Sequence, residues 1–328
     1  MVQLSKKSID QRRTGPMNLK QIDAALAVYE TKLDKTEKAR LAFFRKVWEV
    51  QTALAEEKNK TDVLIPDAAE LQAWVRAEEP ILSQLPASVE ADTLGQAAQK
   101  IAECLVEYGE FSDALSEVLR RTNWERIAAA GDNALAGSDP SAYVEASVGL
   151  LIDDGMTEDE AITGAQVFSL ALRALIGGHA QTISRALATT EAVELRSLHC
   201  PLCGCAAGVA RVGDTATTQG RGKELWCPQC GTTWEYERVR CARCGTQNQA
   251  YLHFFNIEGD DAHRLATCDE CGGYVRTVYQ SDTLAPFSFE VEDVVMAKLD
   301  MIAYQQTEAE SMTAHTGSVL GTTDASTD

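Results

Sequence analysis

The chain has 328 residues, 45% of them hydrophobic and 24% charged, with a formal net charge of −19 and a pI near 4.7. This length predicts two domains, and the apolar content suffices for a hydrophobic core. The acidic balance argues against nucleic-acid binding, because phosphate contacts need a basic face. No apolar run approaches the roughly 20 residues of a membrane span, which argues against membrane insertion.

The beginning of the chain shows no helical periodicity, and we interpret residues 1–18 as a flexible N-terminus. The pair Arg12-Arg13 resembles the start of a twin-arginine export signal. No hydrophobic region follows it, so we reject that interpretation and expect a cytoplasmic protein. A reducing compartment would also keep thiols available for metal.

Residues 19–198 have apolar side chains at helical spacing and are predicted to form an all-α domain. One expected stripe consists of Leu41, Phe44, Val47, Trp48 and Leu54, and a second consists of Ile101, Cys104, Leu105 and Tyr108. Thr157 and Glu160 match a capping box that begins a helix over 158–176. Its core-facing residues are predicted to be Ile162, Ala165, Phe168 and Leu172. Gly177-Gly178 is expected to break or bend this helix, and 132–140 to be a turn-rich connection.

Eight of the ten cysteines form four Cys-x-x-Cys pairs, each followed by glycine. The pairs are Cys200/Cys203, Cys227/Cys230, Cys241/Cys244 and Cys268/Cys271. The intervals 204–226 and 245–267 have the same length, which indicates an internal duplication. We assign 199–244 to the first knuckle pairs and the link to the second module, and 241–285 to that second module.

A Cys-x-x-Cys-Gly segment forms a tight turn in which both sulfurs point at one ion, and glycine accepts the positive φ that the turn requires. Two such knuckles supply four thiolates in a closed tetrahedral site that suits zinc or iron. Sequential pairing predicts one ion on the first two pairs and one on the last two; an interleaved arrangement is the alternative. All eight paired cysteines are therefore candidate metal ligands.

Two other uses of the cysteines are disfavoured. A disulfide framework suits a small secreted domain, and this chain is long with no secretory signal. Dithiol redox catalysis needs its motif at a helix start in a βαβ unit, which is not indicated here. Cys205 and Cys104 are expected to be buried packing residues, although Cys205 could be a spare ligand or a reactive thiol. His199 and His253 are expected to be surface or packing residues.

Short strands are predicted between the knuckles, over 224–226, 233–239, 252–257 and 273–279. Modules this small depend on metal for much of their folding free energy, on the order of 10 kcal/mol per site. Arginines beside the knuckles either offset the charge of four thiolates or are ordinary solvated residues. These are Arg238, Arg240 and Arg243.

The last part of the chain, 286–304, is predicted to contain one amphipathic helix over 291–304 that packs back on a domain. Its apolar stripe comprises Val294, Val295, Leu299 and Ile302. Residues 305–328 are polar and lack periodicity, so we interpret them as a disordered tail. The fold class is thus α+β: a helical domain, two tandem rubredoxin-like or zinc-ribbon-like four-cysteine modules, and a C-terminal helix.

The sequence contains no catalytic constellation: no phosphate-binding glycine loop, nucleophile elbow or open metal site with mixed ligands. We therefore predict no catalytic residues, no organic cofactor site and no enzymatic activity. The pattern favours a binding or scaffolding protein, with electron transfer as an alternative if the metal is iron.

Several segments closely resemble the formate dehydrogenase accessory protein FdhE family. They are Thr217-Thr218-Gln219-Gly220, Leu225-Trp226-Cys227, Thr233-Trp234-Glu235, Arg238-Val239-Arg240-Cys241-Ala242-Arg243-Cys244 and Cys268-Asp269-Glu270-Cys271-Gly272. The C-terminal helix with Asp293, Leu299 and Asp300 also resembles the family's ending. The resemblance is specific over about 200–304 and weaker over the helices.

This resemblance implies a cytoplasmic accessory or maturation factor that binds the catalytic subunit of a respiratory formate dehydrogenase and is required for its activity. It implies iron at the paired cysteines, whereas the residues alone also allow zinc. Cys205 and the polar tail depart from the family pattern, so no role transfers to them. The alternatives are a zinc-ribbon adaptor for transcription or protein assembly, and a rubredoxin-like electron carrier.

Overall fold

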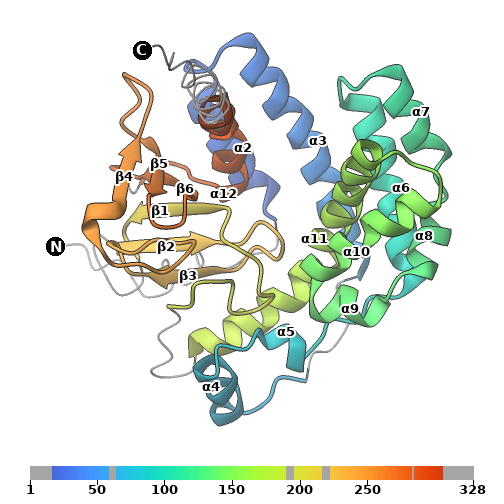
Figure 1. Cartoon of the computed structure of the whole chain (residues 1–328), viewed down its shortest axis with the longest axis horizontal. Helices are drawn as coiled ribbons and strands as arrows, with labels where there is room; N and C mark the ends of the chain where they lie inside the picture. Colours follow the sequence, from blue (N-terminus) through green and yellow to red (C-terminus); the bar gives the residue numbers. More distant parts are fainter. Residues whose placement is uncertain (1–16, 59–63, 190–195, 216–221, 283, 306–328) are drawn as a thin grey trace, which may run out of the picture.

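The structure, a computed structural model, describes residues 17–58, 64–189, 196–215, 222–282 and 284–305 (Figure 1). The predicted flexible N-terminus lies almost entirely outside these ranges, as do Arg12-Arg13 and the polar tail from residue 306. The segment Thr217-Thr218-Gln219-Gly220 lies outside them as well.

Helices form the first part of the described chain, as predicted. Their bounds are α2 Leu19–Tyr29, α3 Lys35–Lys58, α4 Ala68–Arg76, α5 Ile81–Gln84, α6 Ala91–Tyr108, α7 Asp113–Arg121, α8 Trp124–Ala130, α9 Asn133–Ser138, α10 Pro140–Asp153 and α11 Glu158–Thr189. The predicted turn-rich connection at 132–140 contains the short helix α9. Asp132 caps that helix by accepting hydrogen bonds from two backbone N–H groups, so its acidic side chain begins a helix rather than a turn.

Helix α11 is the central helix of the main core. The capping box is confirmed: Thr157 N–H donates to Glu160 Oε2 at 2.8 Å, and Glu160 N–H donates to the Thr157 hydroxyl at 3.4 Å. Of the break or bend expected at Gly177-Gly178, the break is wrong, because the helix continues to Thr189. Buried side chains on both sides of the glycines, Ile176 and Ala180, hold the helix in place. Tertiary packing thus outweighs the glycine penalty of about 1 kcal/mol per residue.

Most of the predicted core residues are buried. Ala165, Phe168 and Leu172 of α11 are fully buried, and so is Cys104 of α6. Ile162 and Tyr108 were expected in the same stripes but are 49% and 44% exposed. Helix α11 also has the length and composition of a membrane span over Glu158–Leu187, yet 56% of that window is buried inside the protein. Its apolar face belongs to the main core.

All strands in the described part of the chain belong to one six-stranded sheet, of order β3-β2-β1-β6-β5-β4. The strands are β1 Val209–Gly213, β2 Gly222–Trp226, β3 Thr233–Tyr236, β4 Leu252–Phe255, β5 His263–Cys268 and β6 Tyr274–Tyr279. The sequence indicated β2, β3, β4 and β6 but not β1 or β5. Neighbouring strands are antiparallel except β1 and β6, which pair in parallel. The two modules therefore share one sheet.

The C-terminal helix is interrupted. Helix α12 spans Phe289–Val295, Met296 forms a turn, and a further helical stretch covers 297–305. The prediction of one continuous helix is therefore wrong at Met296, whose side chain is buried against the sheet with Leu299. Val291 and Val294 of α12 pack with α2 and α3 instead. This segment joins the helical part to the sheet (Figure 1).

Candidate metal centres

The eight paired cysteines lie in two clusters, grouped sequentially. We call Cys200, Cys203, Cys227 and Cys230 site 1, and Cys241, Cys244, Cys268 and Cys271 site 2. The four sulfurs of each site lie within 4.8 Å of one another. The interleaved arrangement does not occur.

All four knuckles have the same backbone geometry. The carbonyl of the first cysteine accepts a hydrogen bond from the glycine four positions later, as from Gly204 to Cys200 at 2.9 Å and from Gly245 to Cys241 at 3.1 Å. The glycines at these turns, Gly204, Gly231, Gly245 and Gly272, have φ between +67° and +81°. Only glycine adopts this conformation without strain, which explains its place after each pair.

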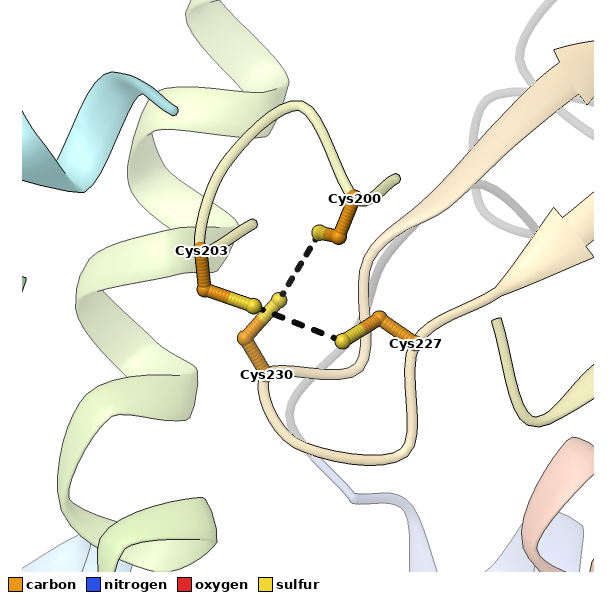
Figure 2. A group of neighbouring side chains, drawn as sticks. All are labelled: Cys200, Cys203, Cys227 and Cys230. Atoms are coloured by element: carbon orange, nitrogen blue, oxygen red, sulfur yellow. Dashed lines mark hydrogen bonds between the residues drawn. The ribbon is translucent and has the colours of Figure 1, made fainter. Parts of the chain in front are cut away.

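The sulfur positions fit a tetrahedral ion. Figure 2 shows the four side chains of site 1 converging from two turns, with Sγ separations of 3.5 Å for Cys200–Cys230 and 3.4 Å for Cys203–Cys227. The corresponding separations in site 2 are 3.9 and 3.8 Å. Four sulfurs about 2.3 Å from one ion lie about 3.8 Å apart. Each site could therefore hold one zinc or iron ion, with no coordination position left for substrate.

Site 1 is buried in the main core. All four of its cysteines are 5% exposed or less and belong to the same apolar cluster as the helical domain. Ile81 and Leu82 of α5 donate backbone hydrogen bonds to the carbonyls of Pro201 and Leu202 inside the first knuckle. Burial raises the pKa of the Cys200 thiol well above its ordinary value, since a lone thiolate there would lose its hydration. A bound cation would provide the missing stabilisation.

Helix α11 holds the second knuckle of site 1 through two side chains one turn apart. Ser169 and Gln229 exchange hydrogen bonds of 2.9 and 3.2 Å. The Arg173 guanidinium donates to the carbonyl of Cys227 at 3.2 Å, pairs with Glu290 at 2.9 Å and lies over the Trp226 ring. Sequence reasoning missed Arg173, because its distance from the cysteines in the chain gives no signal of this contact.

Site 2 lies at the surface of the sheet. Cys241 and Cys268 are buried, whereas Cys244 and Cys271 are exposed. The nearby arginines have structural contacts: Arg240 Nε donates to the Gly245 carbonyl at 3.1 Å, and Arg243 Nε donates to the Tyr274 carbonyl at 2.9 Å. Arg240 therefore fixes the third knuckle, Arg243 joins that knuckle to the start of β6, and Arg238 is exposed.

A buried lysine also approaches site 2 from the first module. Lys223 Nζ of β2 donates to the carbonyl of Arg240, just before the third knuckle, at 3.3 Å. Burial lowers the pKa of Lys223 to about 8. This contact joins strand β2 to the link between the two modules.

The other candidate residues lie outside the two four-sulfur sets. Cys205 is partly buried beside site 1, with its sulfur 3.9 Å from the carbonyl oxygen of Cys203. His199 is exposed, and His253 is exposed and contacts Asp269 at 3.0 Å. The four-sulfur sets are complete without any of them.

A second buried polar cluster holds the second module against helices α2 and α12. His263 of β5 contacts Asp260 at 2.7 Å and Glu292 at 3.0 Å, and the Tyr29 hydroxyl donates to Glu292 at 2.7 Å. Burial opposes protonation of His263, but hydrogen bonds to the two carboxylates outweigh it and raise its pKa to about 9. The imidazolium is the form that this cluster stabilises.

The fold and the sites define a class: a helical protein that carries two closed four-cysteine clusters on one shared sheet. No protein-family model matches the chain. Curated relatives do match part of it. The chain is 31% identical over 109 residues to the FdhE homologue of Aquifex aeolicus, covering 33% of this chain and 38% of that protein. It is 34% identical over 83 residues to FdhE of Escherichia coli O139:H28, covering 25% of this chain and 26% of that protein.

A solved structure shows the same fold over nearly the whole chain. The crystal structure of FdhE from Pseudomonas aeruginosa matches with a TM-score of 0.54 at 16% sequence identity, covering 90% of this chain and 94% of that one. The aligned parts span well under half of the curated relatives' length. The chain is therefore similar to FdhE proteins in part of its sequence and to one FdhE protein in its fold.

Proposed function

We propose that this protein is an accessory factor that binds the catalytic subunit of a respiratory formate dehydrogenase in the cytoplasm and is required for its activity. It would act without being an enzyme and would hold one metal ion at each four-cysteine site. The observation that supports this most is the occurrence, on one chain with an FdhE-like fold, of two closed all-cysteine clusters. Closed sites stabilise a binding surface and leave no position for a substrate.

A cleft between the helices and the first module offers a surface for such a partner. It has a volume of about 930 Å³ and lies between the start of α2, the face of β1 and β2, and the segment before α12. Its lining includes the aromatic residues Trp226, Phe287 and Phe289. A buried ion pair, Arg211 with Glu224 at 2.5 Å, lies in its wall. Trp226 and Phe289 are buried and stacked on each other, so Phe287 is the partly exposed aromatic residue of this wall. Aromatic and arginine side chains are enriched in specific protein interfaces.

Anaerobic affinity purification tests this proposal. The intact protein would be purified from cells that grow with formate, and the co-purifying proteins would be identified by mass spectrometry. We expect the formate dehydrogenase catalytic subunit, and we expect its loss when Cys203→Ser and Cys244→Ser are combined. Absence of the subunit from cells that are making the enzyme would contradict the proposal.

Electron transfer is the second candidate function, because Cys244 and Cys271 of site 2 are exposed. An exposed iron–thiolate edge would permit electron exchange with another protein. Voltammetry of the iron-loaded protein would then show a reversible one-electron couple that disappears in Cys244→Ser. A redox-silent protein would eliminate this candidate and leave the accessory function intact.

A further inference from the structure

The duplication extends from the cysteines to the strands. Cys200 and Cys241 lie 41 positions apart, and so do the other paired cysteines. The same offset places β1 on β4, β2 on β5 and β3 on β6, to within two residues at the start of each strand. Strands β1 and β4 are thus equivalent positions in the two modules.

Equivalent strands have different neighbours. Strand β1 pairs with β2 on one side and in parallel with β6 on the other, from Val209 opposite Arg276 to Val212 opposite Tyr279. Strand β4 pairs with β5 alone and forms one end of the sheet within the described residues. It lies at the margin of the molecule, away from the helical domain (Figure 1). The second module therefore exposes the edge that the first module uses to bind a strand.

The backbone of β4 is oriented for such pairing. Asp269 N–H donates to the carbonyl of Tyr251 at 2.9 Å, in line with the antiparallel register of β4 and β5. The Leu252 N–H donates to the carbonyl of Gln249. Because inward and outward groups alternate along an antiparallel pair, the N–H and C=O groups of Phe254 and the C=O group of Leu252 point to the outer edge. These are the groups that an added strand would bond.

The side chains around β4 indicate the chemistry of the added strand. Phe254 is 55% exposed and Tyr251 is 42% exposed, and neither lysine nor proline protects the edge over 249–256. The turns at its two ends carry exposed acidic residues, namely Glu258, Asp261, Asp269 and Glu270. Apolar contact along the strand with negative charge at both ends favours a segment that combines β-forming and basic residues.

We propose that the outer edge of β4 binds an extended, basic segment of a partner protein as a seventh, parallel strand. The pairing of β6 with β1 is the precedent within this chain, and β6 itself carries Arg276 among β-branched and aromatic residues. This inference deepens the proposed function, since the segment would belong to the partner. Its test needs no formate dehydrogenase, so the two can fail separately.

The probe is a fluorescent peptide with the sequence of residues 273–280, which contains β6. Fluorescence anisotropy would measure its binding to the intact, metal-loaded protein. We expect saturable binding, weakened severalfold or more by Arg276→Glu in the peptide because of the acidic surroundings. Absence of saturation at about 1 mM peptide would overturn the proposal, because a Kd above about 1 mM is too weak for a specific interaction.

Two protein variants locate the binding. Phe254→Pro removes an outward N–H that β5 does not use, and we expect roughly tenfold weaker binding from the loss of that hydrogen bond and its alignment. The variant Phe254→Ala keeps the backbone N–H, so its affinity for the peptide should fall less than that of Phe254→Pro. Equal binding to wild-type and Phe254→Pro proteins of equal thermal stability would overturn the proposal.

Hydrogen exchange of the unmodified protein gives an answer even if Phe254→Pro does not fold. The amide of Phe254 should exchange rapidly in the free protein and become protected when peptide is added. Slow exchange of the Phe254 amide in the free monomer would show that the chain itself covers this edge. Protection that depends on protein concentration would assign the edge to a second copy. Either result would overturn the proposal.

Discussion

Site 1 and site 2 come from one repeated sequence pattern but lie in different surroundings. Site 1 is enclosed by the helical core, with all four cysteines buried and helix α11 bonded to its second knuckle. Site 2 has two exposed cysteines and lies at the surface of the sheet. Cysteine spacing thus specifies the ligands, whereas the neighbouring elements decide how accessible a bound ion is. We infer that site 1 serves the fold and that site 2 is open to solvent and to other molecules.

The largest difference in stability is expected between the variants Cys203→Ser and Cys244→Ser. The two cysteines occupy equivalent positions of the repeat. Loss of a ligand at site 1 removes metal-linked folding free energy, on the order of 10 kcal/mol, within the main core. That amount rivals the whole stability of a typical domain, so we expect an aggregated or partly unfolded protein. Cys244→Ser should leave the helices folded. Thermal unfolding followed by circular dichroism would measure the stability of both variants. Equal midpoint temperatures would contradict the proposed difference between the two sites.

The attachment of the second module should depend on pH. The pKa of His263 is about 9 in the folded protein and about 6.5 unfolded, so protonation stabilises the fold. This contribution is complete below pH 6.5 and is lost as pH rises through 9. The stability difference between wild type and His263→Gln should therefore shrink by up to about 3 kcal/mol between pH 6 and pH 10.

Urea unfolding at several pH values would measure this change. The control is His253→Gln, at an exposed histidine of the same module. Its effect on stability should be small and constant across the range. A constant difference between wild type and His263→Gln would show that the cluster does not depend on an imidazolium.

The smallest effect on stability is expected for alanine substitutions of two equivalent glycines, Gly231 of site 1 and Gly272 of site 2. Both have positive φ, so alanine costs about 1–2 kcal/mol at either position. A Cβ on Gly231 would also lie 2.8 Å from the Arg173 guanidinium, whereas one on Gly272 would meet nothing within 4 Å. Gly231→Ala should therefore lower the unfolding free energy more than Gly272→Ala. The reverse order in matched denaturant titrations would contradict the tighter packing of site 1.

The sequence predicted local features well. Each knuckle is decided by five consecutive residues, and the capping box of Thr157 and Glu160 by four, so neighbours in the chain suffice. Strands β1 and β5 were not predicted because neither contains Phe, Trp or Tyr, whereas each predicted strand does. The 41-residue offset of the repeat would have predicted both, because it places the predicted strand β2 on β5 and the predicted strand β4 on β1.

Contacts between segments that lie far apart in the sequence could not be predicted from local patterns. The parallel pairing of β1 with β6 joins the first strand of one module to the last strand of the other. The contact of Arg173 with Cys227 bridges 54 positions of the chain. Neither leaves a periodic pattern, so the sharing of one sheet and the unequal burial of the two sites emerge only from the assembled fold.

The most direct test of the difference between the sites is native mass spectrometry of the protein loaded with two zinc ions during exposure to a chelator. Alkylation of freed cysteines, located by peptide mapping, would identify the emptied site. We expect a long-lived one-ion species with modified Cys244 and Cys271 and protected Cys200 and Cys203. Simultaneous loss of both ions, or earlier modification of site 1, would contradict the account.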